Sequence, residues 1–163
     1  MNALHNRLDV TLDSLLPVEQ RLRSSLLDDR AWFPITGQSL IDGNVDAQRV
    51  RDAFLQRFQQ ASDLLLRKLF PRLLAVIEAS PEPVPFVDVL ERLHRFGLLD
   101  EPHDWATLNE LRNRLVHDYV LDRDELAEDF NLAWAMSDAV LGQIDRLRRY
   151  AIDHHLLSEG KSS

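Results

Sequence analysis

Residues 45–79 read VDAQRVRDAFLQRFQQASDLLLRKLFPRLLAVIEA, and this stretch sets the fold of the chain. Its large apolar side chains recur every four or seven residues, which is the spacing of one face of an α-helix. These side chains are Val50, Phe54, Phe58, Leu65, Leu69 and Leu73. We therefore expect one long amphipathic helix from Val45 to about Ala79. Pro71 lacks an N–H for the helical hydrogen bonds, so we expect it to bend the last third of this helix.

The sequence on either side of this stretch predicts further helices joined by turns. Upstream, leucines recur at helical spacing, Pro17 predicts a kink or a break, and a turn-rich connection follows. Downstream, the run SPEPVP at residues 80–85 ends the long helix. Apolar spacing and capping residues then predict helices over residues 86–96, 100–119 and 122–154. The expected fold class is all-α, an up-down bundle of four to five helices.

The length of 163 residues suits one compact domain rather than two. We expect residues 1–44 to form an N-terminal helical segment and loop packed on the bundle. The helical domain itself is expected over residues 45–157, followed by a frayed tail at residues 158–163.

The composition restricts the classes of function. Nineteen Lys and Arg against 27 Asp and Glu give a formal net charge of −8. This argues against broad, sequence-independent nucleic-acid binding, which depends on a positive surface, although it is compatible with a local basic pocket. The chain has no cysteine, which excludes disulfides and thiolate chemistry. No apolar run approaches the length of a membrane span, so we expect a cytoplasmic protein without membrane contact.

The segment Arg112-Asn-Arg-Leu-Val-His117-Asp-Tyr119 carries the most informative chemistry. On a helix, Arg112 and Tyr119 lie on nearly the same face, next to an apolar stripe. An arginine beside the core is costly unless it is paired or used. His117 points roughly 140° away from Arg112 on an ideal helix. The two side chains can meet if the helix ends near Val116, or if two subunits pair this segment across a two-fold axis.

Ordinary structural roles compete with a functional one at each of these positions. A histidine near a helix end is often solvated or a cap, and a helical arginine often makes a salt bridge. Tyr119 can be a packing residue at the edge of the core. Metal binding has no comparable signal: His154 and His155 are adjacent and diverge on a helix, so we expect no metal site and no cofactor.

The pattern Arg-Asn-x-x-x-His-x-Tyr near the end of the penultimate helix, before a long final helix, resembles the HEPN domain. It is most similar to the HepT toxins and to the related substrate-binding-type subunits of minimal nucleotidyltransferases. The segment from Arg57 to Arg67 resembles the family's Arg-Phe-(x)-Glu-Leu-(x)-Lys helix, with Asp63 at the acidic position. Residues 86–99 resemble the third helix of the family, so the resemblance covers roughly residues 45–150.

Two features depart from the family pattern. Gln60 and Ser62 stand where aromatic side chains are common, and residues 1–44 are longer than in a minimal member. Because of these departures, the resemblance does not define the substrate or the role of the N-terminal segment.

The resemblance implies a metal-independent endoribonuclease whose composite site lies at a homodimer interface, where RNA is cleaved by its own 2′-hydroxyl. His117 is implied as the general acid or base. Arg112 is implied to hold the phosphate and to stabilise its developing charge. Asn113 is implied to orient the imidazole or to bind a phosphate oxygen. Asp63 is implied to orient Arg112, with an ordinary ion pair as the alternative.

The implied partners are RNA as substrate, a second copy of the chain and a cognate nucleotidyltransferase antitoxin. In HepT-like systems the antitoxin adenylylates the tyrosine that matches Tyr119, and the added nucleotide blocks phosphate entry by its bulk and negative charge. Two other functions stay open at this point. One is a non-catalytic subunit that presents substrate to a nucleotidyltransferase or restrains it, and the other is a structural HEPN module without activity.

Overall fold

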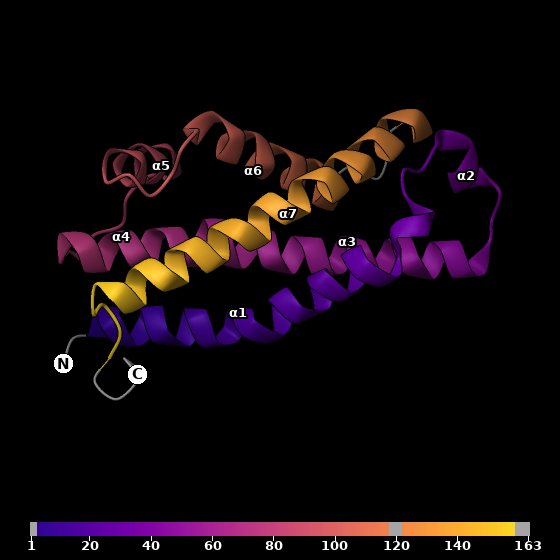
Figure 1. Ribbon diagram of the computed structural model, residues 1–163. Helices are drawn as coiled ribbons and strands as arrows, with labels where there is room; N and C mark the ends of the chain where they lie inside the picture. Colours follow the sequence, from indigo (N-terminus) through magenta and orange to yellow (C-terminus); the bar gives the residue numbers. More distant parts are fainter. Residues whose placement is uncertain (1–2, 118–121, 159–163) are drawn as a thin grey trace.

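The computed structural model describes residues 3–117 and 122–158, and every regular element within these ranges is helical (Figure 1). The predicted all-α class is confirmed. No helix in these ranges is long and apolar enough to cross a bilayer. In chain order the elements are α1 (Ala3–Asp28), the 3₁₀ turn η1 (Arg30–Trp32), α2 (Gly37–Ile41), α3 (Val45–Leu64), the π turn η2 (Leu65–Leu69), α4 (Phe70–Glu78), α5 (Phe86–Arg95), α6 (Pro102–His117) and α7 (Arg123–Asp153).

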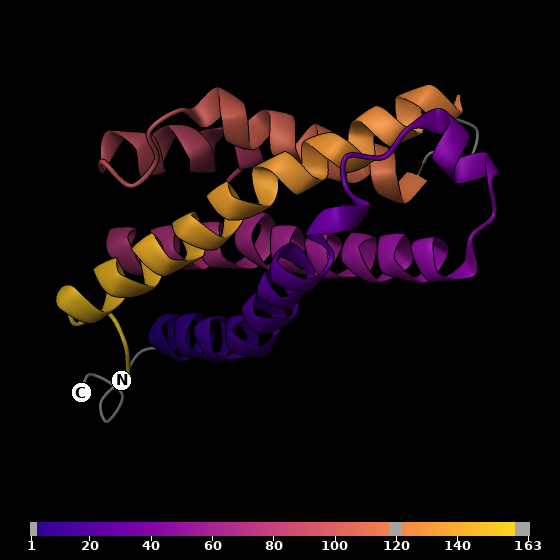
Figure 2. The ribbon, with the colours of Figure 1, turned by 45° about the vertical axis from the view of Figure 1, so that its right-hand side comes forward.

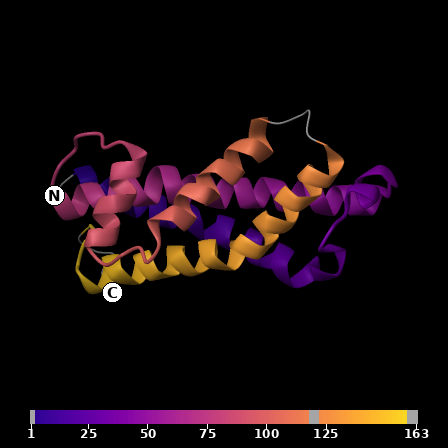
Figure 3. The same ribbon diagram turned by 90° about the horizontal axis from the view of Figure 1, so that it is seen from above.

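Among the described residues, four long segments run alternately up and down the molecule (Figures 1 and 3). They are α1, then one rod made of α3, η2 and α4, then α6 and α7. The shorter α5 crosses one end of the rod, and the short α2 packs against α7 at the other end. The start of α1 and the end of α7 lie together at one end of the bundle (Figure 1).

The rod accommodates Pro71 differently from the expected helix. Immediately before this proline, η2 forms a π turn in which the N–H of Phe70 reaches the carbonyl of Leu65, five residues back. Pro71 then stands at the start of α4, where it cannot donate to the carbonyl of Arg67 as a regular α-helix would require. The π turn replaces the predicted bend, and the rod stays close to straight (Figure 1).

Helix α1 passes through Pro17 without a break and changes direction along its length (Figure 2). The buried carboxylate of Glu19 on this helix accepts a hydrogen bond from Arg148 of α7 at 2.9 Å. Through α1, the segment predicted over residues 1–44 is thus a full member of the bundle. The side chains that α1 places in the core are Leu8, Leu12, Leu15, Val18 and Leu22.

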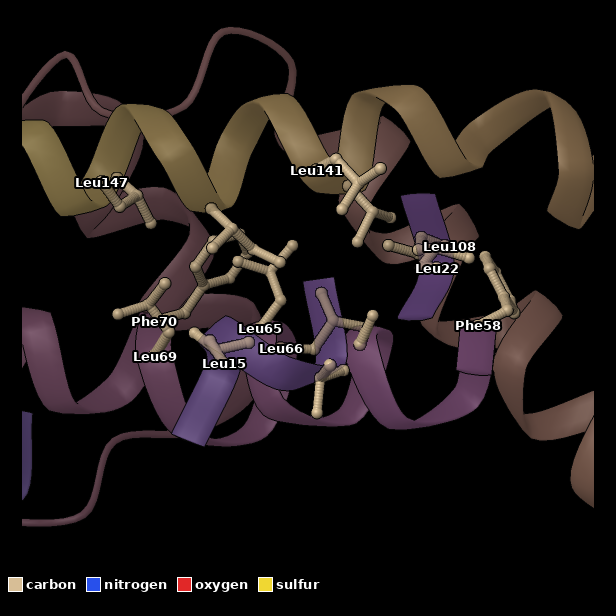
Figure 4. Close-up of a cluster of buried hydrophobic side chains, with 14 of the residues drawn as sticks. Leu15, Leu22, Phe58, Leu65, Leu66, Leu69, Phe70, Leu108, Leu141 and Leu147 are labelled. Carbon is tan, nitrogen blue, oxygen red and sulfur yellow. The ribbon is translucent and has the colours of Figure 1, made fainter. Parts of the chain in front are cut away.

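One hydrophobic core joins the four long segments. Burying a leucine or phenylalanine side chain stabilises a fold by about 1.5–3 kcal/mol, so this core holds α6 firmly against α3 and α7. That contact positions the candidate site described below. Figure 4 shows the core side chains Leu15 and Leu22 of α1, Phe58, Leu65, Leu66, Leu69 and Phe70 of the rod, Leu108 of α6, and Leu141 and Leu147 of α7.

The end of the described chain is anchored to α1. Ser158, the first residue of the predicted frayed tail, donates its backbone N–H to the buried carboxylate of Asp9 at 3.1 Å. The imidazole of His5 also contacts the carbonyl of Leu156, at 2.6 Å. Ser158 is therefore held in place, and residues 159–163 lie outside the described residues.

Candidate functional site

Helix α6 carries the motif, and its sequence explains where it begins and which face it buries. Pro102 opens the helix, where its fixed φ is helical and its missing N–H would have no helical partner. Leu111 is fully buried, and the Trp105 ring meets Phe70 of α4 edge-on at 5.5 Å between centroids. Arg112 follows Leu111 directly, so its aliphatic stem begins at the edge of the core.

Arg112 of α6 is paired with Asp63 of α3. Its Nη2 donates to Oδ2 at 2.7 Å, and its Nε lies 2.6 Å from Oδ1 without pointing along a hydrogen-bond direction. The Arg112 side chain is 15% exposed and the Asp63 side chain 35%, so water screens the pair only in part. The two residues stand 49 positions apart in the chain. The fold, and not local sequence, therefore brings these two predicted site residues together.

Arg67 and Asn113 extend this ion pair into a cluster. We call the five residues Asp63, Arg67, Asn109, Arg112 and Asn113 the Asp63 cluster. Nε of Arg67 lies 3.3 Å from the Asp63 oxygen Oδ1 that Arg112 also contacts. The amide oxygen of Asn113 accepts from Arg67 at 3.1 Å and from Arg112 at 3.2 Å. The Arg67 side chain is 47% exposed, so its guanidinium faces the solvent.

The Asp63 cluster is locally positive although the chain is acidic. Two guanidiniums share one carboxylate, in a chain whose formal net charge is −8. Each guanidinium has five N–H donors, so Asp63 and the two neighbouring amide oxygens do not use them all. The remaining donors of Arg67 and Arg112 suit a planar or tetrahedral anion such as phosphate.

His117 stands apart from the cluster. Helix α6 continues to this residue, so an early helix end does not turn the imidazole towards Arg112. The side chain is exposed, and no described residue forms a hydrogen bond or ion pair with it. Arg114 instead ties this end of α6 to α7 through two hydrogen bonds to Asp129, at 2.9 and 3.1 Å. A single chain thus fixes Arg112 and leaves His117 facing outward.

Of the five predicted site residues, the structure places four. Asp63, Arg112 and Asn113 are brought into contact, and His117 is not. Tyr119, the predicted modification site, lies outside the described residues. Within the described ranges, no three His, Asp or Glu side chains are arranged to hold a metal ion.

Two members of the Asp63 cluster are not pointed out by the motif. Arg67 enters it because it stands four residues after Asp63, and such pairs share a helix face. That spacing is a usable signal in the sequence. Asn109 stands one helical turn before Asn113, and its side-chain oxygen lies 3.5 Å from Nη2 of Arg67. No sequence signal distinguishes Asn109 from the other polar residues of α6.

Comparisons with known proteins leave the motif and its geometry as the basis for a functional assignment. No protein-family model matches the chain, and neither a curated protein nor a solved structure matches it.

Proposed function

We propose that this chain is a HepT-like toxin of the HEPN class, a metal-independent endoribonuclease that works in the cytoplasm. The observation that carries the proposal is the Asp63 cluster. It holds the motif arginine of α6 near the surface, with guanidinium donors left over for a phosphate. An arginine that only stabilises the fold needs one carboxylate. It gains nothing from a second guanidinium that competes for the same oxygen, as Arg67 does here.

The proposed reaction is cleavage of the RNA backbone by its own 2′-hydroxyl. His117 takes the 2′-hydroxyl proton as that oxygen attacks phosphorus, with a ring nitrogen as the general base. The P–O5′ bond breaks, and the 5′-oxygen leaves with a proton from water or from a second imidazole. The products are a 2′,3′-cyclic phosphate and a 5′-hydroxyl. Arg112 stabilises the charge on the non-bridging oxygens, and Asn113 positions the guanidinium that does so.

The proposed site is completed by a second copy of the chain. Arg112 is locked to α3 and His117 points away from it on the same helix, so one chain does not present both groups to one phosphate. A two-fold axis near the end of α6 would set His117 of one protomer against Arg112 of its partner. This supports the homodimer as the active form.

One observation favours a second function. A net charge of −8 repels RNA at long range, whereas a ribonuclease that acts alone gains from a positive field. The alternative is a non-catalytic subunit that presents substrate to a minimal nucleotidyltransferase or restrains it. In that case the Asp63 cluster would bind a phosphate without cleaving anything.

The test is cleavage of single-stranded RNA in EDTA by purified wild type, Arg112→Ala, His117→Ala and His103→Ala. His103 is the matched control because it is an exposed histidine on the same helix, near its opposite end. We expect wild type and His103→Ala to produce 2′,3′-cyclic phosphate ends. Arg112→Ala and His117→Ala should lose about 10²–10³ in rate while keeping the helical circular dichroism.

Two results decide against this function. Equal activity of all four proteins would identify a contaminant and remove the catalytic assignment. RNA binding without cleavage by wild type would leave the non-catalytic subunit as the function.

A further inference from the structure

A pocket with several polar side chains on its wall lies at the far end of the rod from Pro71. It has a volume of about 250 Å³ and lies between the η1–α2 connection and the first turns of α3. Arg51 on its wall and Asp63 are 12 positions apart on α3, which is roughly 18 Å along a helix and about a third of a turn around it. The pocket is therefore separate from the Asp63 cluster. The lining residues that matter for its chemistry are Trp32, Thr36, Ser39, Asp42, Asn44 and Arg51.

Arg51 is the unusual residue of this pocket. It is only 7% exposed, yet its one hydrogen bond to another described residue runs from Nη1 to the carbonyl of Ser39 at 3.3 Å. No described carboxylate lies within ion-pair distance of it. By contrast, the buried carboxylate of Glu19 is paired with Arg148. A buried guanidinium without a counter-charge is costly, and its unused N–H donors are available to an anion in the pocket.

The walls of the pocket are fixed before any ligand arrives. The side-chain amide of Asn131 on α7 accepts a hydrogen bond from the backbone N–H of Ile35 and donates one to the carbonyl of the same residue, both at 2.8 Å. Thr36 and Ser39 form a reciprocal capping box at the start of α2. Asn44 caps α3 through the N–H groups of its first turn. Arg51 is the one cationic side chain among the residues that line the pocket, and most of its donors have no partner among the described residues.

The pocket also offers a flat apolar surface and an acceptor. Trp32 lines it and is 38% exposed, which leaves part of the indole free for stacking. Asp42 lines it too, and its Oδ1 accepts from Gln38 at 2.9 Å, so the second carboxylate oxygen can accept from a ligand. A buried cation, an aromatic surface and a carboxylate together suit a ligand with an anionic end, a planar ring and hydroxyl or amine donors.

We propose that this pocket binds one nucleoside monophosphate unit. Arg51 takes the phosphate, Trp32 stacks on the base, and Asp42 accepts from ribose hydroxyls or from a base amine. The volume is small for a drug-sized ligand and fits one such unit at most. The unit is either a free nucleotide or one residue of an RNA chain. This proposal does not depend on the ribonuclease function.

The experiment is isothermal titration of the full chain with adenosine 5′-monophosphate, adenosine and inorganic phosphate. Wild type should bind the monophosphate more tightly than either fragment. Arg51→Met keeps the length of the side chain and removes its charge, and it should weaken binding by about tenfold or more. Arg49→Met is the matched control, because Arg49 is exposed on the same helix and does not line the pocket. Arg112→Ala removes the phosphate site proposed at the Asp63 cluster, so binding that persists in this variant and is lost in Arg51→Met belongs to this pocket.

The two sources of the ligand are distinguished by competition. A 2′-O-methyl RNA oligonucleotide, which resists cleavage, should displace the monophosphate if the pocket holds a residue of RNA, and should leave it bound if the ligand is a free nucleotide. Trp32→Ala should weaken binding of the monophosphate while leaving the Arg51 guanidinium in place. It serves as a second variant if Arg51→Met does not fold. Equal affinity of wild type, Arg51→Met and Trp32→Ala overturns the proposal, as does the absence of binding at millimolar monophosphate.

Discussion

The carboxylate of Asp63 on α3 holds the guanidinium of Arg112 on α6 across a helix–helix contact, with one hydrogen bond of 2.7 Å and a second close approach of 2.6 Å. The pair ties the motif helix to the rod at the point where Arg67 and Asn113 also gather. It therefore acts on stability and on the candidate site at once, and the two effects can be measured separately.

A double-mutant cycle measures the contribution of this pair to stability. Urea unfolding of wild type, Asp63→Asn, Arg112→Met and the double variant should give a coupling free energy of about 1–2 kcal/mol, between the values for surface and for buried pairs. The exposed pair of Asp145 and Arg149 on α7 is the control and should couple by less than about 0.5 kcal/mol. A coupling for the Asp63 pair no larger than this control would show that the contact is not energetically significant.

Arg67 should matter for RNA binding more than its neighbour Lys68 does. Both are exposed cations of η2, but only Arg67 belongs to the Asp63 cluster. With a 2′-O-methyl RNA, Arg67→Ala should bind more weakly and lower the slope of log affinity against log salt by about 0.7, the value for one phosphate contact on a single strand. Fluorescence anisotropy over a salt series measures both. A larger loss in Lys68→Ala would move the phosphate site away from the cluster.

A composite site at a dimer interface predicts the molecular mass of a dimer, and it predicts that two inactive variants restore activity when they are mixed. Light scattering should give about twice the monomer mass of 18.9 kDa. Arg112→Ala and His117→Ala are each expected to be inactive, but a mixed dimer keeps one intact site if the two groups come from different protomers. After refolding together, an equal mixture should regain about a quarter of the wild-type activity. If the mixture stays inactive while wild type cleaves RNA, both groups act within one chain.

Tyr119 provides a test of control by a partner. Co-expression with a nucleotidyltransferase encoded beside this chain should add the mass of one adenylate and abolish the proposed toxicity, because the adenylate adds negative charge to the motif that carries Arg112. Tyr119→Phe should stay toxic and escape this silencing, since no acceptor oxygen remains. Intact-protein mass spectrometry of the neutralised complex is the deciding measurement. An unmodified chain in that complex would point to neutralisation by physical occlusion.

The pair of Glu19 and Arg148 predicts that α1 is required for stability. The hydrogen bonds that Arg148 donates to the Glu19 carboxylate raise the pKa of the Arg148 guanidinium. Because this pKa is raised, the contribution of the pair to stability is fully present below the ordinary arginine pKa. At neutral pH, Glu19→Gln should therefore lower the free energy of unfolding by about 2–4 kcal/mol, because it leaves Arg148 half-buried without its partner. Glu128→Gln, an exposed position on α7, should change it by less than about 0.5 kcal/mol.

Apolar periodicity predicted the main elements of the fold and missed the local irregularities. Every member of the predicted stripe from Phe54 to Leu73 is buried, and Val50 is half-buried. Pro17 predicted a kink or a break, and α1 continues through it while changing direction along its length (Figure 2). Pro71 predicted a bend, and a π turn stands in its place. Neither proline ends its helix, because core packing on both sides outweighs one lost hydrogen bond.

The π turn had a signal in the sequence that a helical stripe does not capture. In an α-helix, residues four positions apart are offset by about 40° around the helix axis, so three such steps add up to about 120°. A π turn accommodates one extra residue, which corresponds to about 100° of rotation. It therefore offsets most of this drift and keeps residues that are spaced by four on one face of the helix. The buried residues of this region form adjacent pairs repeated every four positions: Ala61 and Ser62, Leu65 and Leu66, Leu69 and Phe70, Leu73 and Leu74.

The candidate site was only partly predictable. Helical geometry places Arg112 and His117 on different sides of α6, and the structure agrees that they do not meet within the described chain. The burial of Arg51 could not be predicted from the sequence of its own helix. Arg51 stands beside the apolar stripe of α3, but it is buried by α2 and the loop before it, and no local pattern predicts that contact.

The π turn has a consequence for aligning this chain with proteins whose matching helix is regular. It amounts to one additional residue between Asp63 and the core positions of α4, so a gapless alignment can match the site or the core but not both. An alignment that opens a gap of one residue within 65–69 restores both registers together. Deleting one residue within 65–69 should therefore convert the π turn into a regular α-helical turn and keep Asp63 in register with both Arg112 and the core positions of α4.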